Sequence, residues 1–141
     1  MVFMTQTTAM THFEQLLNAA KSQAQPQQLL FLFAAAQLPS DATPEQRVRF
    51  EAGQGGELEP LACVDKTPDE LSSFEALVEE ARSACPTWQV VFVSTLSGHD
   101  HQPPSSERID AALGKMVEGL RAGALAPYMA LDPRGEPLLF S

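Results

Sequence analysis

Two segments of the chain are almost wholly apolar, and we predict that both are strands. Residues 28–37 contain the apolar run Leu29 to Ala36, and residues 88–96 are rich in β-branched and aromatic residues, a composition that favours strands. A short buried helix remains the alternative for the first segment, because alanine favours helices. A continuous apolar run of this length is typical of a strand covered on both faces, as in a parallel sheet.

Four other segments place apolar residues at helical spacing behind a capping residue. Thr11, Thr43 and Thr67 each begin a capping-box pattern with Glu or Gln three residues later, and Ser105 or Ser106 precedes the fourth segment. We therefore predict four helices, over residues 12–24, from Thr43 to near Gly53, from Thr67 to about Ala84, and from Ser106 to Gly123.

Two weaker strands complete the predicted fold. Residues 58–65 form a strand whose pairing is limited by Pro60, and residues 128–132 and 137–140 flank Gly135 as a terminal β-hairpin. The order of elements is α-β-α-β-α-β-α-β-β, an alternation typical of right-handed βαβ crossovers. We predict an α/β fold in one three-layer domain, with a mostly parallel sheet and an antiparallel hairpin at its C-terminal end.

The length of 141 residues corresponds to one domain, which we place at residues 11–141. Residues 1–10 carry no Lys or Arg and no apolar core of a signal peptide, so we expect a flexible N-terminus and a cytoplasmic protein. The longest apolar run has eight residues, below the ~18 of a membrane span. The glycines of residues 53–56 precede a strand rather than follow one, which indicates a flexible turn and not a phosphate-binding loop.

The formal net charge of −9, with only nine Lys and Arg, argues against two classes of partner. Nucleic acids and anionic membranes both require basic patches. The acidity is explained by solubility alone. Cys63 and Cys85 form neither a Cys-x-x-Cys pair nor a metal-binding spacing, so we expect free thiols and no cofactor.

The predicted strands direct attention to one edge of the sheet. Ligands of open α/β sheets bind beyond the carboxyl ends of the strands, and the predicted order brings polar side chains from three loops to that rim. These candidate ligand-binding residues are Asp41, Asp65, Lys66, Ser97, His99, Asp100 and His101.

The loop after residues 88–96 offers the most specific chemistry. His99 and His101 could ligate one metal ion, with Asp100 as a third ligand or as a hydrogen-bond acceptor that orients a histidine. The simpler interpretation is a solvated polar loop. Ser97 has no nucleophile-elbow motif around it, and we assign no catalytic residue.

Most of the chain resembles a known family. The segments that carry the resemblance are Leu29-Leu-Phe-Leu-Phe-Ala34, Asp41-Ala-Thr-Pro-Glu-Gln-Arg47, Cys63-Val-Asp-Lys-Thr-Pro-Asp-Glu-Leu71 and Val91-Phe-Val-Ser-Thr-Leu-Ser-Gly98. They look like small proteobacterial proteins that often carry the label "ribonucleotide reductase subunit alpha". That label implies cytoplasmic reduction of ribonucleotides with electrons from thiols, which requires a radical-forming cysteine and a redox pair.

A second resemblance is topological. Residues 124–136 look like the cis-proline strand and following hairpin of thioredoxin-like proteins, with Pro127 as the matching proline. The Cys-x-x-Cys of that family would open the helix after Asp65, where this chain has Lys66-Thr-Pro-Asp-Glu70. The resemblance implies a thioredoxin-like fold that retains a binding role without redox activity.

These observations lead to three hypotheses about function. The first is a non-enzymatic cytoplasmic interaction or regulatory module that binds another protein or itself. The second is a small-ligand or metal-binding protein, or an enzyme, that uses the rim around Asp65 and residues 99–101. The third, from the family label alone, is a protein associated with ribonucleotide reductase.

Overall fold

The structure is a computed structural model that describes residues 11–38, 41–52 and 57–138. Three sequence predictions fall outside these residues: the flexible N-terminus at 1–10, the glycine turn at 53–56 and the last residues of the terminal hairpin at 139–140. The described residues contain both helices and strands, which confirms the predicted mixture of α and β structure.

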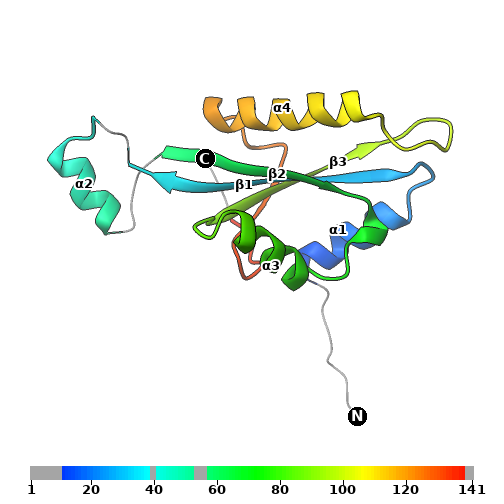
Figure 1. Cartoon of the computed structure of the whole chain (residues 1–141), viewed down its shortest axis with the longest axis horizontal. Coiled ribbons are helices and arrows are strands. Elements are labelled where there is room, and N and C mark those ends of the chain that lie inside the picture. The colour runs from blue at the N-terminus through cyan, green and yellow to red at the C-terminus, as the bar shows by residue number, and fades with distance from the viewer. Residues whose placement is uncertain (1–10, 39–40, 53–56, 139–141) are drawn as a thin grey trace, which may run out of the picture.

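The elements follow the predicted order closely (Figure 1). The helices are α1 (His12–Lys21), α2 (Pro44–Glu51), α3 (Phe74–Ala84) and α4 (Ser106–Ala122), with a 3₁₀ turn, η2 (Pro68–Glu70), before α3. The strands are β1 (Gln27–Gln37), β2 (Glu57–Lys66), β3 (Val90–Ser97) and β4 (Met129–Leu131).

The sheet is antiparallel throughout, so the predicted mostly parallel sheet is wrong, and with it the thioredoxin-like topology that depended on parallel strands. The strand order is β2-β1-β3-β4, and each neighbouring pair is antiparallel. Two connections explain the error. The first is the segment with α2, which joins β1 to β2; these two strands are neighbours in the sheet, so α2 does not cross one of its faces. The second is the segment with α3, which joins β2 to β3; these two strands run in the same direction but are separated by β1.

Alternate residues of β1 build two separate cores. Leu29, Phe31 and Phe33 pack with α1 and α3 on one face of the sheet, whereas Leu30 and Leu32 pack with α4 on the other. Figure 1 shows α4 above the sheet and the other two helices below it. The prediction that this strand is covered on both faces is therefore confirmed, although by helices on an antiparallel sheet.

The capping signals act locally as expected in two of three cases. Thr11 and Thr43 form complete capping boxes at α1 and α2. The box at Thr67 begins only the 3₁₀ turn η2, so the predicted start of the third helix is wrong. That helix begins after Ser73, whose hydroxyl accepts a hydrogen bond from the N–H of Ala76 at 3.0 Å. Apolar periodicity did not reveal this break.

Trp88 lies in the core. It is 4% exposed, and its ring meets Phe33 edge-on with ring centroids 5.0 Å apart. Such aromatic pairs stabilise a core beyond their buried area, by roughly 0.5–1.5 kcal/mol.

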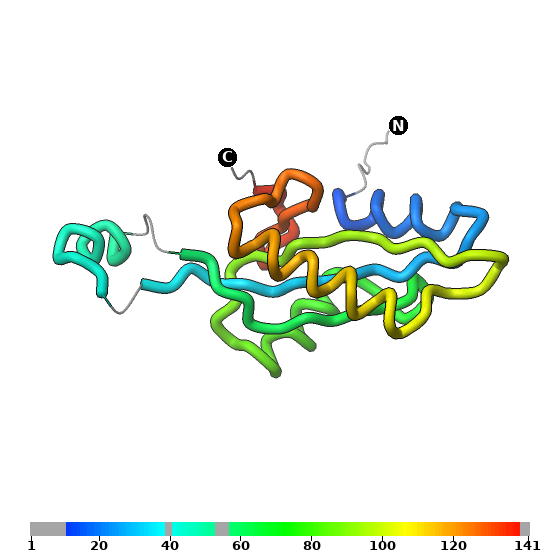
Figure 2. Tube along the Cα trace, turned by 90° about the horizontal axis from the view of Figure 1, so that it is seen from above, coloured from blue at the N-terminus to red at the C-terminus, as the bar shows by residue number. Residues whose placement is uncertain are grey.

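The strands β1 and β2 continue beyond the rest of the sheet. The pairing of β1 with β3 ends at Ala34, but its pairing with β2 continues to Gln37 opposite Glu57. Figures 1 and 2 show this two-stranded ribbon projecting from the domain with α2 at its tip. We call residues 37–38, 41–52 and 57 the arm.

Truncation of an apolar side chain should lower the stability of the protein much more in the core of the sheet than in the arm. Phe31 is fully buried, so Phe31→Ala should lower the free energy of unfolding by ~3–5 kcal/mol. Val48, in the arm, is 67% exposed, and Val48→Ala should change it by less than about 0.5 kcal/mol. Urea denaturation followed by circular dichroism measures both values, and similar losses for the two variants would contradict this division.

Candidate functional site

The antiparallel sheet brings only part of the predicted rim together. Asp65 and Lys66 end β2, and Ser97 ends β3, so these residues lie at the same end of the sheet, where β1 begins. The turn formed by residues 99–102 continues from this end. Asp41 lies at the opposite end, beyond the last residue of β1, because that strand runs the other way.

Two glutamines that the sequence did not single out organise this rim. Gln27 and Gln28 are each 7% exposed, and they are the buried polar residues of the described chain. The amide of Gln27 donates to Ser97 Oγ at 2.6 Å, and that of Gln28 donates to Asp65 Oδ2 at 2.8 Å. Through these bonds the first residues of β1 are connected to Ser97 of β3 and Asp65 of β2. The only sequence signal was two glutamines at the edge of an apolar run.

The His99–Gln102 segment is a tight hairpin turn rather than an open loop. Backbone hydrogen bonds join His99 and Gln102 in both directions, at 3.1 and 2.9 Å. Asp100 and His101 have positive φ angles of 52° and 63°, a conformation that Asp and His adopt more readily than most residues. Gly98 permits the close approach, because a Cβ there would collide with the backbone oxygen of Gln102.

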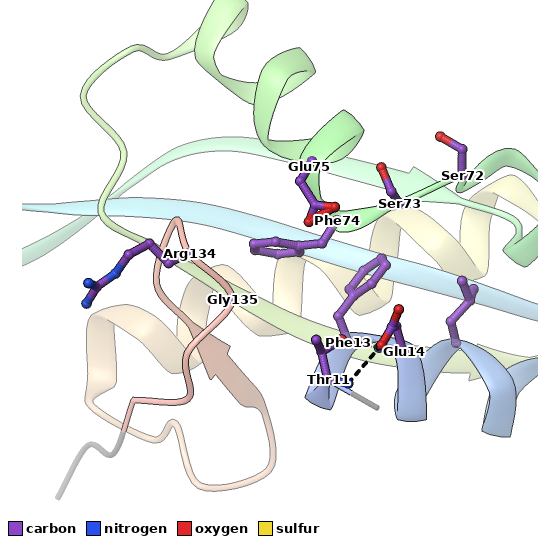
Figure 3. Close-up of a pocket in the computed structure, with 10 residues that line it drawn as sticks. Thr11, Phe13, Glu14, Ser72, Ser73, Phe74, Glu75, Arg134 and Gly135 are labelled. Carbon is purple, nitrogen blue, oxygen red and sulfur yellow. Dashed lines mark hydrogen bonds between the residues drawn. The ribbon is translucent and has the colours of Figure 1, made fainter. Parts of the chain in front are cut away.

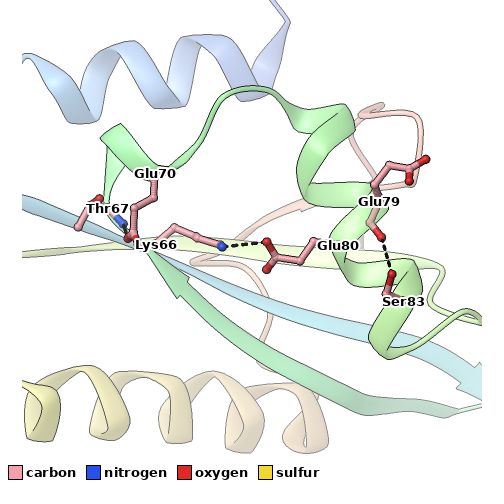
Figure 4. Close-up of polar contacts among 6 residues, drawn as sticks. All are labelled: Lys66, Thr67, Glu70, Glu79, Glu80 and Ser83. Carbon is pink, nitrogen blue, oxygen red and sulfur yellow. Dashed lines mark hydrogen bonds and ion pairs between the residues drawn. The ribbon is translucent and has the colours of Figure 1, made fainter.

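The cationic member of the rim is already engaged. Lys66 Nζ lies 2.9 Å from Glu80 Oε1 on α3, with 21% of the lysine side chain exposed (Figure 4). Next to it, the carboxylate of Glu70 accepts the backbone N–H of Thr67 at 2.7 Å, and this bond lowers the pKa of Glu70. These contacts hold the end of β2, η2 and α3 together and perform a structural role.

Metal and thiol chemistry find little support in the described residues. No group of three or more His, Cys, Asp or Glu side chains there could hold a metal ion, so the pair His99 and His101 stays a prediction without a third ligand. Cys63 and Cys85 are both free thiols, and burial raises the pKa of each. At neutral pH they are therefore protonated and weakly nucleophilic.

The described surface carries several depressions. A shallow groove of about 500 Å³ runs from the end of α1 to His101 at the rim, and polar side chains line much of it. A slot of about 180 Å³ lies over Phe13 and Phe74 (Figure 3). Beside it, a groove of about 290 Å³ separates α3 from the turn after β4. We call this last depression the α3 groove.

Asp132 forms the turn that borders the α3 groove. Its Oδ1 accepts the backbone N–H groups of Arg134 at 2.8 Å and Glu136 at 3.0 Å. Burial would raise the pKa of this carboxyl, but the N–H donors and the Arg134 guanidinium outweigh burial and lower the pKa. The turn presents Arg134 with 83% of its side chain exposed.

The most unusual surface element is α2, which the sequence predicted as a helix but not as a site. None of its residues is buried. Val48 is 67% exposed and is the exposed large hydrophobic residue of the described chain. A signal was available in the sequence: this segment has only two large apolar residues, Val48 and Phe50, and they do not share a helical face. Such a helix cannot cover a sheet.

The free edge of β2 carries several features that protect it from pairing with another strand. Pro60 removes a backbone donor, and Leu61 forms a bulge between the partners of Phe33 and Ala34. Glu57 and Glu59 add charge to the same strand. Proline, bulges and charges are the usual means by which proteins prevent edge-to-edge association. This edge is therefore a weaker candidate for an interaction site than α2.

Comparison with known proteins gives no further guide. The chain matches no protein-family model, no curated protein and no solved structure. Within the described ranges, no helix is both long and apolar enough to cross a membrane. The functional argument therefore rests on the geometry of this chain alone.

The lowered pKa of Asp132 predicts a pH-dependent stability. The ionised carboxylate stabilises the fold above the ordinary Asp pKa of ~3.9, and this contribution is lost as pH falls through the lowered folded-state value. Asp132→Asn, which cannot ionise, should therefore unfold more easily than the wild type at pH 7, and this difference should shrink as pH falls below the ordinary Asp pKa. Urea unfolding at a series of pH values from neutral to acidic measures the difference. A difference that does not vary with pH would contradict the assignment.

Proposed function

We propose that this protein is a protein-interaction module and that α2, at the tip of the arm, is its binding element. The observation that carries the proposal is a capped helix that buries none of its residues in its own domain. In globular proteins, most helical stability comes from packing an apolar face against other elements. A helix without that packing is best explained by a partner surface that supplies it.

The energetics of a short helix support this interpretation. Isolated helices shorter than ~12–15 residues are marginal in water, and α2 has eight residues. Its start is nevertheless well specified, by Thr43 as N-cap, Pro44 at the first position and Gln46 in the capping box. The segment is thus prepared to be helical, but it buries none of its residues in the rest of the described chain.

The exposed face of α2 has the form of a helix that binds in a groove. Pro44, Val48 and Ala52 follow one another at a spacing of four residues, which places them on one ridge, and all three are exposed. Arg47 and Arg49 flank Val48 in sequence. Helices that bind in a groove place their anchors at i, i+3, i+4 and i+7 on one face, and the ridge of Pro44, Val48 and Ala52 has this four-residue spacing.

If the arm serves binding rather than folding, the domain should fold without it. Gln37 and Glu57 are paired across the ribbon, so an Asn-Gly turn can replace residues 38–56 as a two-residue hairpin. This variant should retain the wild-type circular dichroism spectrum and unfold cooperatively within a few degrees of the wild-type Tm, as measured by thermal denaturation. A chain that no longer folds would show that the arm is structural.

A photo-crosslinking amino acid tests where partners bind. Placed at Val48, it should give an adduct with a protein upon irradiation of cells that express the variant. Placed at Ala111, an exposed position on α4, it should give none, which makes it a matched control. Electrophoresis and mass spectrometry measure the adducts. Equal labelling at both positions, or no adduct at Val48, would reject α2 as the binding element.

A further inference from the structure

We infer that the partner of α2 is a second copy of this chain, and that α2 binds in the α3 groove of that copy. This inference rests on the proposed function and names its partner. With each chain offering one α2 and one α3 groove, a two-fold axis gives a dimer with two identical contacts.

The shape of the α3 groove suits one turn of a helix. Phe74, Val78 and Pro133 form its apolar floor, and its volume is about 290 Å³. Sites for whole small molecules usually range from ~300 to 1,000 Å³ and enclose their ligand. The α3 groove lies at the lower end of this range and is open between a helix and a turn, so it has room for Val48 and parts of the charged side chains beside it.

The charges of the groove and of α2 are complementary. Glu75 and Glu79 lie four residues apart on α3 and line the groove, with both residues exposed. On α2, Arg47 and Arg49 flank Val48. Arg47 and Arg49 project on opposite sides of Val48, so seating Val48 in the groove would bring one of them to the wall that carries Glu75 and Glu79. The helix α2 also carries glutamates, among them Glu45, which can pair with positive charges of the groove.

The positive charges of the groove are complementary to the glutamates of α2. Arg82 and Arg134 line it and are both exposed, and they would face Glu45 and Glu51 at the two ends of α2. Both elements therefore present mixed charges in matching patterns, an arrangement that gives specificity as well as attraction. Figure 3 shows Arg134 directed away from the Phe13–Phe74 slot.

The arginines of α2 and the two glutamates of the groove form no ion pair within the described chain. The ion pairs there are Lys66–Glu80 and the weaker Arg134–Asp132 contact at 3.6 Å. Arg47, Arg49 and the two groove glutamates take part in neither. Because α2 projects beyond the end of the sheet in both views (Figures 1 and 2), it does not reach the α3 groove of its own chain. A second copy can supply the missing contact.

The test is a reciprocal charge reversal, measured by sedimentation velocity over a range of concentrations. The wild type should form a dimer of twice the 15.3 kDa chain mass. Arg47→Glu/Arg49→Glu and Glu75→Arg/Glu79→Arg should each weaken self-association by about 100-fold or more, because like charges then meet in both contacts. Mixed in equal amounts, the two variants should form a heterodimer of near wild-type affinity, because both contacts regain opposite charges.

Matched controls carry the same change of charge elsewhere on the surface. Lys115→Glu/Arg121→Glu and Glu107→Arg/Glu118→Arg alter exposed residues of α4 and should leave the dimer intact. Circular dichroism confirms that each variant is folded, and Val48→Asp, which changes no groove residue, should also abolish the dimer. A wild type that is monomeric at all concentrations, or variants that fail to rescue each other, would overturn the inference.

The outcome separates this inference from the proposed function. A monomeric wild type with a Val48 adduct to a different protein would reject self-association and leave α2 as the binding element. Loss of the adduct would reject both.

Discussion

The structure depends on the complete burial of the central strand β1. From Leu29 to Ala35 each residue is at most 5% exposed, so this segment needs cover on both faces and hydrogen bonds along both edges. The unpaired backbone groups of a buried strand would cost several kcal/mol. The strands β2 and β3 satisfy its edges, and α1, α3 and α4 cover its faces. At its first residues, two buried glutamine amides bind Ser97 and Asp65 and so fix where the flanking strands end.

The sequence predicted what is encoded locally. The apolar run revealed the buried strand, and the capping boxes at Thr11 and Thr43 located two helix starts within a residue. Strand direction is not local, because an apolar strand pairs equally well in either direction and a helix between two strands does not by itself make a crossover. The box at Thr67 forms but begins only η2: Leu71 is extended and buried in the core, and α3 begins anew after Ser73.

The candidate sites also show that local features could be predicted from the sequence and strand direction could not. Asp65, Lys66, Ser97 and the His99–Gln102 turn were correctly grouped at one end of the sheet, since β2 and β3 run in the same direction. Asp41 was not, because the direction of β1 could not be deduced. The polar residues of this rim are largely engaged in holding the sheet together. The exposure of α2 was signalled in the sequence only by the lack of a shared apolar face, and its place at the tip of the arm required the structure.

The position of the arm between two adjacent antiparallel strands has an evolutionary consequence. A segment inserted at such a point leaves every other strand order, register and core contact unchanged, because Gln37 and Glu57 would be neighbours with or without it. Its sequence and length are thus under little constraint from folding. If α2 is the binding element proposed above, related chains can acquire new binding preferences by changes in this inserted segment while their cores stay the same.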